Sequence, residues 1–191
     1  MRRFVAVVVP LVLVVTACGG DDDEPTGTTG AVGNGLAFTG GAVVEGEPID
    51  PEFTCDGANT SPALAWSGVP AEAAELALIM DDPDAPGGTF THWVVYALPP
   101  DYRELPPGIP PGPAVSGAIT LRQGTTDGSD TPGYFGPCPP GGETHDYLFT
   151  LYALDEETGL DGGASVDDLR AAVEGHVLAE GTLTAPYSRA R

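Results

Sequence analysis

The chain contains no lysine, and its 7 basic residues, all of them arginine, are outnumbered by 28 aspartates and glutamates. The formal net charge is −21 at pH 7. Proteins that bind nucleic acids neutralise backbone phosphates with lysine and arginine, whereas a surface this acidic repels them. The composition therefore argues against nucleic acid as a partner, and the charge favours solubility.

Long hydrophobic runs are also scarce, and the longest lies at the N-terminus. Residues 4–15 are apolar apart from one proline, and they follow Arg2 and Arg3. A membrane-spanning helix needs roughly 20 apolar residues, so this run is too short to cross a bilayer comfortably. A positive start followed by a short apolar run is typical of a signal peptide.

Cys18 lies directly after the apolar run, behind the small residues Thr16 and Ala17 and ahead of two glycines. This arrangement resembles a bacterial lipobox, in which the cysteine becomes the first mature residue and carries acyl chains such as palmitate. We therefore predict a lipoprotein signal peptide over residues 1–17 and a lipid anchor at Cys18. The protein would then sit on the extracytoplasmic face of the cell membrane. An ordinary secretory signal with a chance cysteine is the alternative.

Residues 18–35 hold glycine, threonine and a run of acidic residues, and they contain almost nothing apolar after the cysteine. Such a segment cannot bury enough surface to offset the entropy lost on ordering. We predict that residues 18–35 are the lipidated cysteine and a flexible acidic tether. Residues 36–191 would then form one folded domain.

Within this domain, 27 glycines and 20 prolines in the whole chain predict frequent turns and few long helices. Short apolar runs over residues 75–80, 91–98 and 147–154 predict strands that are buried on both faces. Residues 36–44 and 114–121 are weaker strand candidates. The proline-rich residues 99–113 predict a stiff surface loop.

One helix is indicated after Ser165, which can cap its start together with Asp168. Apolar residues follow at helical spacing, and Gly175 is a plausible end. Residues 177–184 then read as a final strand. Many strands with one late helix predict a mainly β fold, namely a β-sandwich.

The other two cysteines are Cys55 and Cys138. Export places them in an oxidising compartment, where a pair of thiols tends to form a disulfide. Two buried free thiols are one alternative. A zinc site that uses both is another, although their spacing matches no Cys-x-x-Cys arrangement.

Acidic residues and histidines adjoin three of the predicted strands. Asp82 and Asp84 flank a proline after the first of these, and they face the same side if the backbone stays extended. His92 and His145 stand at the starts of the other two. Taken singly, the aspartates would cap backbone N–H groups in a turn, and the histidines would be satisfied core residues. Taken together, they predict a small polar pocket at one end of a sheet.

The same motifs resemble a known family. Residues 82–86 (Asp-Pro-Asp-Ala-Pro), 92–94 (His-Trp-Val) and 136–140 (Gly-Pro-Cys-Pro-Pro), with His145 and Tyr147, are similar to the signature of the phosphatidylethanolamine-binding protein family. The similarity is to its bacterial Raf-kinase-inhibitor-like branch, and it covers roughly residues 36–188.

The resemblance implies a phosphatidylethanolamine-binding-protein-like β-sandwich with one or two short helices near the C-terminus. It also implies a pocket for small anions such as phosphate, phosphorylated head groups or phosphorylated side chains. The ligand-binding residues carried over are Asp82, Asp84, His92, Pro139, Pro140, His145 and Tyr147. One departure is Asp146, because relatives commonly carry arginine after this histidine.

We therefore expect a membrane-anchored binding protein for a small anionic or zwitterionic phosphorylated ligand, one that inhibits or modulates an unknown protein partner such as a kinase or protease. A divalent-metal site or a weakly hydrolytic site built from the same aspartates and histidines is the alternative. No Gly-x-Ser-x-Gly elbow occurs and neither cysteine is plainly activated. We accordingly predict no enzymatic activity, no cofactor and no resident metal.

Overall fold

The computed structural model describes residues 35–191. The predicted signal peptide, Cys18 and the tether up to residue 34 lie outside the described residues. The described part is mainly β, with a single α-helix near the C-terminus, so the predicted fold class is confirmed. A search of the same residues for a helix that is long and apolar enough to span a membrane finds none.

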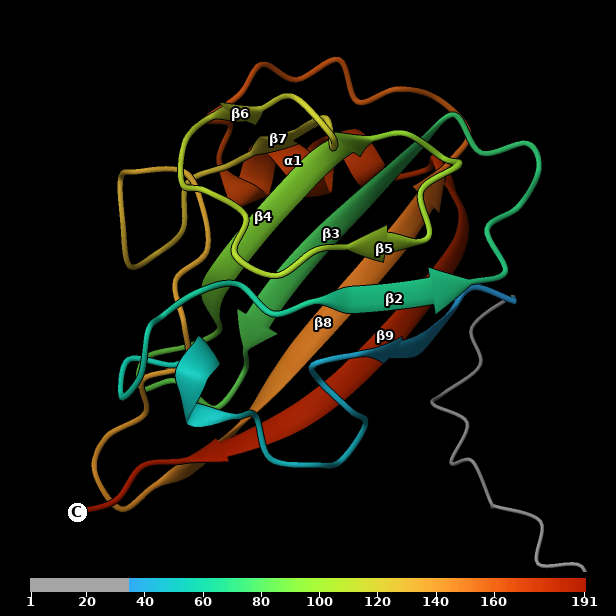
Figure 1. The fold of residues 1–191 in the computed structure, drawn as a ribbon. Coiled ribbons are helices and arrows are strands. Elements are labelled where there is room, and N and C mark those ends of the chain that lie inside the picture. The colour runs from blue at the N-terminus through green and yellow to red at the C-terminus, as the bar shows by residue number, and fades with distance from the viewer. Residues whose placement is uncertain (1–34) are drawn as a thin grey trace, which may run out of the picture.

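The strands form two sheets, and all of their pairings are antiparallel. The large sheet has the order β6-β7-β4-β3-β8-β9, and the small sheet has the order β1-β2-β5. Figure 1 shows the small sheet in front of the large sheet and the helix behind it. The elements are β1 (Ala37–Gly41), a 3-10 helix η1 (Pro51–Phe53), β2 (Leu64–Ser67), β3 (Glu75–Asp82), β4 (Phe90–Leu98), β5 (Glu104–Leu105), β6 (Ala114–Val115), β7 (Leu121–Gln123), β8 (Thr144–Leu154), α1 (Val166–Val173) and β9 (Val177–Ser188).

The central strands β3 and β4 are buried on both faces, as their apolar runs predicted. The same prediction was wrong for most of β8, because its buried residues alternate with half-buried ones. Along β3, even-numbered residues pack into the core between the two sheets, and odd-numbered residues pack against α1. The first set is Leu76, Leu78 and Met80, and the second is Ala77 and Ile79, which meet Leu169 and Val173 of the helix. Because side chains alternate along a strand, Asp82 continues the side of the inter-sheet core and Asp81 the side of the helix.

Several predicted boundaries differ from the structure, and three of these differences have a clear physical reason. The proline-rich segment contains β5, because Leu105 and Ile109 are buried under the small sheet and β5 pairs with β2. Residues 114–121 form two short strands that pair with each other, since the chain turns at Gly117 with a φ of 142°. The last strand continues past Pro186, which a sheet tolerates because β9 is an edge strand.

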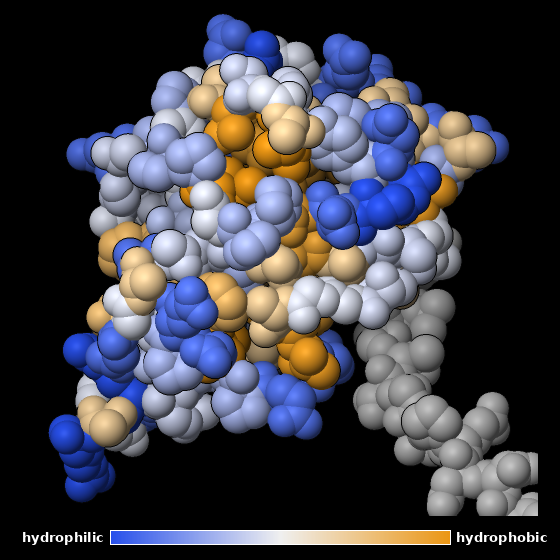
Figure 2. Space-filling view, viewed as in Figure 1, coloured by the Kyte–Doolittle hydropathy of each residue, from blue (hydrophilic) through white to orange (hydrophobic). Residues whose placement is uncertain are grey.

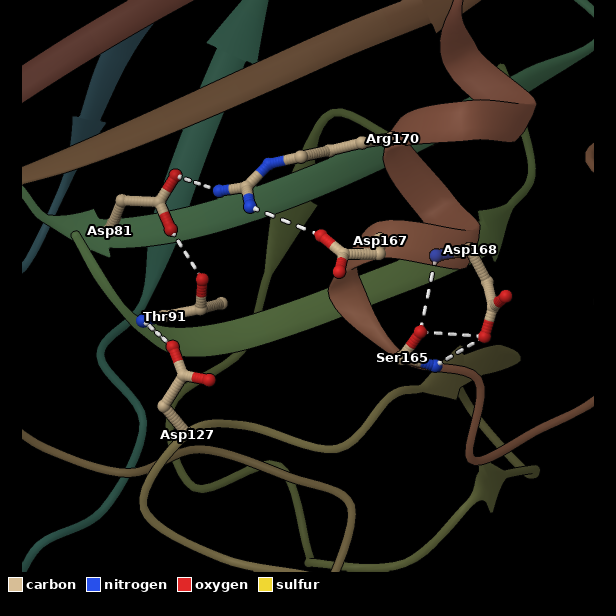
Figure 3. A network of polar contacts seen from close by, with 7 residues as sticks. All are labelled: Asp81, Thr91, Asp127, Ser165, Asp167, Asp168 and Arg170. Carbon is tan, nitrogen blue, oxygen red and sulfur yellow. Dashed lines mark hydrogen bonds and ion pairs between the residues drawn. The ribbon is translucent and has the colours of Figure 1, made fainter. Parts of the chain in front are cut away.

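The helix begins with the predicted capping box. The Ser165 hydroxyl accepts the Asp168 backbone N–H at 3.1 Å, and Asp168 Oδ2 accepts the Ser165 backbone N–H at 3.0 Å. Figure 3 shows this pair and, one turn on, Arg170 reaching the strand residue Asp81. Gly175 follows the helix with a φ of 85°, a conformation that glycine adopts without strain.

The surface is mostly polar, and Val44 and Val177 are the large hydrophobic side chains that stand exposed in residues 35–191. Figure 2 shows hydrophobic residues in a seam on the face where loops and the small sheet lie over β3 and β4, with hydrophilic residues around it. The seam is the visible edge of the core between the two sheets.

Ser165→Ala should lower the free energy of unfolding by about 1 kcal/mol, because it removes the hydroxyl that caps the first turn of α1. Urea unfolding followed by circular dichroism measures the change. Ser67→Ala is a matched control, since Ser67 is exposed at the end of β2. Equal losses in the two variants would contradict the capping role.

Candidate functional site

Antiparallel pairing brings three distant segments to one edge of the large sheet. β3 ends where β4 and β8 begin, so Asp82 pairs with Phe90 and Asp81 pairs with Leu148. The end of β3 therefore places Asp82 beside His145 on one neighbour and His92 on the other. The predicted convergence of these residues follows from the register of three strands.

A β-bulge decides which way His92 faces. Met80 pairs with Trp93 but Asp81 pairs with Thr91, so His92 is an extra residue on β4. Because the bulge shifts the pairing by one residue, it changes the direction in which the side chains of Thr91 and His92 point. The His92 ring meets Tyr147 edge-on at 5.2 Å on the inter-sheet side, while the Thr91 hydroxyl donates to Asp81 on the helix side.

A cavity of about 470 Å³ lies at this edge. Four of the predicted ligand residues line it: Asp82, His92, Pro140 and His145. The remaining lining is largely apolar and includes Phe90, Phe135 and Pro86. The site is therefore an aromatic-walled cavity with a polar base, and it is less polar than the motifs alone predicted.

His145 is held by Asp82 at the base of the cavity. Its Nδ1 donates to Asp82 Oδ2 at 2.7 Å, and both side chains are buried. Its Nε2 lies 3.4 Å from Glu143 Oε2. Burial alone would lower the pKa of His145, but the hydrogen bond and negative charge of Asp82, helped by Glu143 and Asp84, raise this pKa above the ordinary value of 6.5.

His92 is held differently. Its Nδ1 lies 2.6 Å from the carbonyl oxygen of Phe135, which can only accept, so Nδ1 carries the proton and donates. When the ring is neutral, Nε2 is consequently an acceptor. Burial lowers the pKa of His92 below 6.5, against the opposing effects of the Phe135 carbonyl and of Asp82. The two histidines therefore tend toward opposite charge states.

The two aspartates of the acidic loop have different partners. The chain turns at Pro83 instead of staying extended, and Asp82 Oδ1 accepts the backbone N–H of Asp84 at 2.9 Å. Asp84 Oδ2 accepts the backbone N–H of Asp146 at 2.9 Å, so its exposed carboxylate ties the loop to β8. Asp82 combines a turn contact with the histidine contact, whereas Asp84 is not among the cavity-lining residues.

Tyr147 and Pro139 are buried behind the lining of the cavity. The Tyr147 hydroxyl has no hydrogen-bond partner among the described residues. Burial raises the pKa of Tyr147 above its ordinary value, and the charge of Asp82 acts in the same direction. Tyr147 therefore stays neutral and supports the His92 ring by packing.

A disulfide joins Cys55 to Cys138, with their Cα atoms 5.4 Å apart. Cys138 lines the cavity, and Cys55 follows η1. The bond therefore ties the cavity wall to a segment 83 residues earlier in the sequence. Both sulfur atoms are used in this bond, which leaves no thiolate for zinc.

The sequence did not single out the aromatic walls or Gly128. Phe135 directly precedes the motif at residues 136–140 and Phe90 lies two residues before His92, and this proximity is the one signal that could have identified them. A Cβ atom on Gly128 would lie 2.7 Å from the Phe135 ring, so a larger residue there would displace this wall of the cavity.

A polar network on the helix side supports the same edge (Figure 3). Asp81 Oδ2 is 2.8 Å from Arg170 Nη2, and Asp81 Oδ1 accepts the Thr91 hydroxyl at 2.7 Å. Asp127 Oδ2 accepts the Thr91 backbone N–H at 2.7 Å. The network connects α1 through β3 and β4 to the segment that carries Gly128.

The geometry of the cavity gives little support to a metal site or to a hydrolytic site. Among residues 35–191, no group of three or more histidine, cysteine, aspartate or glutamate side chains is placed to hold a metal ion. The lining contains no serine or threonine, and its cysteine is in the disulfide. The lining presents His92, His145 and Asp82 beside the aromatic walls of Phe90 and Phe135.

Several known proteins are similar to this chain. A UPF0098 protein of Methanothermobacter thermautotrophicus is 51% identical over 142 residues, which cover 74% of this chain and 91% of the relative. LppC of Mycobacterium tuberculosis, whose name describes it as a lipoprotein, is 46% identical over 128 residues, which cover 63% of this chain and 56% of LppC.

A crystal structure of CT736 from Chlamydia trachomatis, described as a phosphatidylethanolamine-binding protein homologue, superimposes with a TM-score of 0.72. It is 35% identical in sequence, and the match covers 82% of this chain and 99% of CT736. The family model "Phosphatidylethanolamine-binding protein" matches residues 39–188, which is nearly the whole described domain. The chain belongs to the phosphatidylethanolamine-binding protein family.

Proposed function

We propose that the protein is a lipid-anchored, extracytoplasmic binding protein whose aromatic-walled cavity takes a phosphorylated head group. The observation that carries this proposal is the pair of buried histidines in one cavity with opposite pKa shifts, one held by a carboxylate and one by a carbonyl. The pair supplies both a charged donor and a neutral acceptor to a ligand.

A singly protonated phosphate monoester complements this pair. Its negative oxygens can accept from the His145 imidazolium, and its P–OH can donate to the neutral Nε2 of His92. Asp82 favours the charged form of His145, but its own negative charge offsets most of that positive charge. Among residues 35–191 no arginine lines the cavity, so a bare phosphate ion would gain little Coulomb energy from this lining.

A zwitterionic head group has more to gain than phosphate alone. Its ammonium group can approach Phe90 and Phe135, and the carboxylates of Asp82 in the lining and Glu143 beside His145 favour a cation. Phosphoethanolamine therefore fits the cavity better than inorganic phosphate does.

The membrane anchor is supported by two observations outside the described domain. Cys18 follows a signal-peptide pattern, and one relative bears the name of a lipoprotein. Inhibition of a kinase or protease stays a hypothesis that rests on the family resemblance alone.

His92→Ala and His145→Ala should each weaken the binding of phosphoethanolamine by about tenfold or more, because each removes a hydrogen bond to a charged ligand. Isothermal titration calorimetry of the purified full-length protein measures the affinity. His176→Ala is the matched control, since His176 pairs with Asp155 at the surface and lies outside the cavity lining. Equal affinity in all four proteins would reject the site, and tighter binding of inorganic phosphate than of phosphoethanolamine would reject the zwitterion.

The histidine ring signals should titrate on opposite sides of 6.5, with His145 above and His92 below. Nuclear magnetic resonance of the ring protons against pH tests this order. His145 stabilises the fold fully below its unfolded pKa of about 6.5 and loses this effect as the pH rises through its raised pKa. His92 has the opposite effect, because the unfolded state binds its proton more readily as the pH falls below 6.5.

Asp82→Asn should lower the pKa of His145, because it removes the negative charge that favours the imidazolium. Asparagine keeps an Oδ1 acceptor for the backbone N–H of Asp84, so the turn is preserved. The same ring titration measures the effect, and Asp155→Asn beside His176 is the control. An unchanged His145 midpoint would mean that Asp82 does not set its charge.

A further inference from the structure

A second cavity, of about 500 Å³, lies at the opposite end of the large sheet. The first cavity adjoins the end of β3 and the start of β4. The second is lined by Glu75 at the start of β3, Leu98 at the end of β4, Arg122 on β7 and the nearby Thr158. The two cavities share no lining residue.

A buried carboxylate shapes the wall of this second cavity. Glu75 is 4% exposed, and its Oε1 accepts the backbone N–H of Ala97 and the hydroxyl of Thr158, each at 2.9 Å. Its Oε2 accepts the backbone N–H of Thr158 at 3.2 Å. Ala97 has a φ of 54°, in the left-handed region that costs a residue with a side chain. The hydrogen bond from the Ala97 N–H to Glu75 stabilises this strained residue in the cavity wall.

Arg122 is the cationic residue of the cavity lining, and it is half-buried. One Nη1–H donates to the carbonyl of Leu160. Within residues 35–191, Arg170 and Arg189 form ion pairs with aspartates, but no carboxylate oxygen lies within 4.0 Å of the Arg122 guanidinium. Glu75 and Glu157 line the same cavity, but neither carboxylate forms an ion pair with this partly desolvated cation.

We propose that this cavity binds a small monoanionic carboxylate, which Arg122 holds through its guanidinium. The planar fork of guanidinium donors matches the two oxygens of a carboxylate. Thr120 and Ser116 also line the cavity and offer hydroxyl groups to the same anion.

The rest of the lining narrows the ligand class. Leu98, Pro99 and Val115 offer apolar surface to a short aliphatic chain. Glu157 also lines the cavity and Glu75 lies in its wall, so a doubly charged phosphate is repelled more strongly than a carboxylate. The ligand is therefore a short-chain carboxylate rather than a phosphate. This inference concerns a separate site and does not depend on the proposed function of the first cavity.

The test is a nuclear magnetic resonance titration of the full-length protein with butyrate, following the Arg122 Nε–H and the Ala97 amide signals. Both signals should shift and saturate, while the His92 and His145 ring signals stay in place. Arg122→Gln should weaken butyrate binding by about tenfold or more, because it removes charge-assisted hydrogen bonds. Arg189→Gln is the matched control, since it removes a guanidinium that already pairs with Asp56 and lies outside this cavity lining.

Arg122→Lys keeps the positive charge and replaces the fork with a single ammonium group, so it decides the question if Arg122→Gln does not fold. Its affinity for butyrate should fall at least several-fold. Shifts that grow linearly without saturating, affinity that is unchanged in the folded Arg122 variants, or tighter binding of inorganic phosphate at the same signals would each overturn the proposal.

Discussion

β3 is paired along its length with β4 on one side and β8 on the other, and both neighbours run antiparallel to it. The register of these three strands is the constraint on which the other features depend. It brings the end of β3 against the starts of both neighbours, and it brings the start of β3 against their ends. Each end of this one strand consequently borders a cavity, with Asp82 at one and Glu75 at the other.

Both of these carboxylates are buried, and burying a charge is costly unless hydrogen bonds or an opposite charge compensate it. The compensating partners differ between the two ends of β3. Glu75 accepts three neutral donors, from Ala97 and Thr158, and these contacts shape the backbone. Asp82 shares its oxygens between a turn N–H and the His145 imidazole, so its contacts include a group that titrates. The Asp82 end therefore includes a histidine whose raised pKa makes its charge depend on pH.

Much of the fold could be predicted from local patterns. The apolar runs of β3, β4 and β8 alternate between two cores, and the Ser165 capping box starts the helix where the sequence placed it. The strands β2 and β5 were missed because each is short and gains its stability from pairing with the other and from burial of Trp66 and Leu105. A segment of two to four residues is too short for a period of alternating side chains to predict that it pairs with another strand.

The sequence by itself determined the class of fold, the acidic surface, the helix start and the set of motifs that meet at one sheet edge. These features depend on composition, on side-chain alternation and on neighbours a few residues away. Only the tertiary structure decided that a bulge turns His92 toward Tyr147, that Asp84 binds the backbone of β8, and that phenylalanines wall the cavity. It also decided the opposite pKa shifts of His92 and His145, and it gave Arg122 a carbonyl partner but no ion pair within the described domain. These features depend on contacts between residues distant in sequence, because strand register and burial set the partners of each side chain.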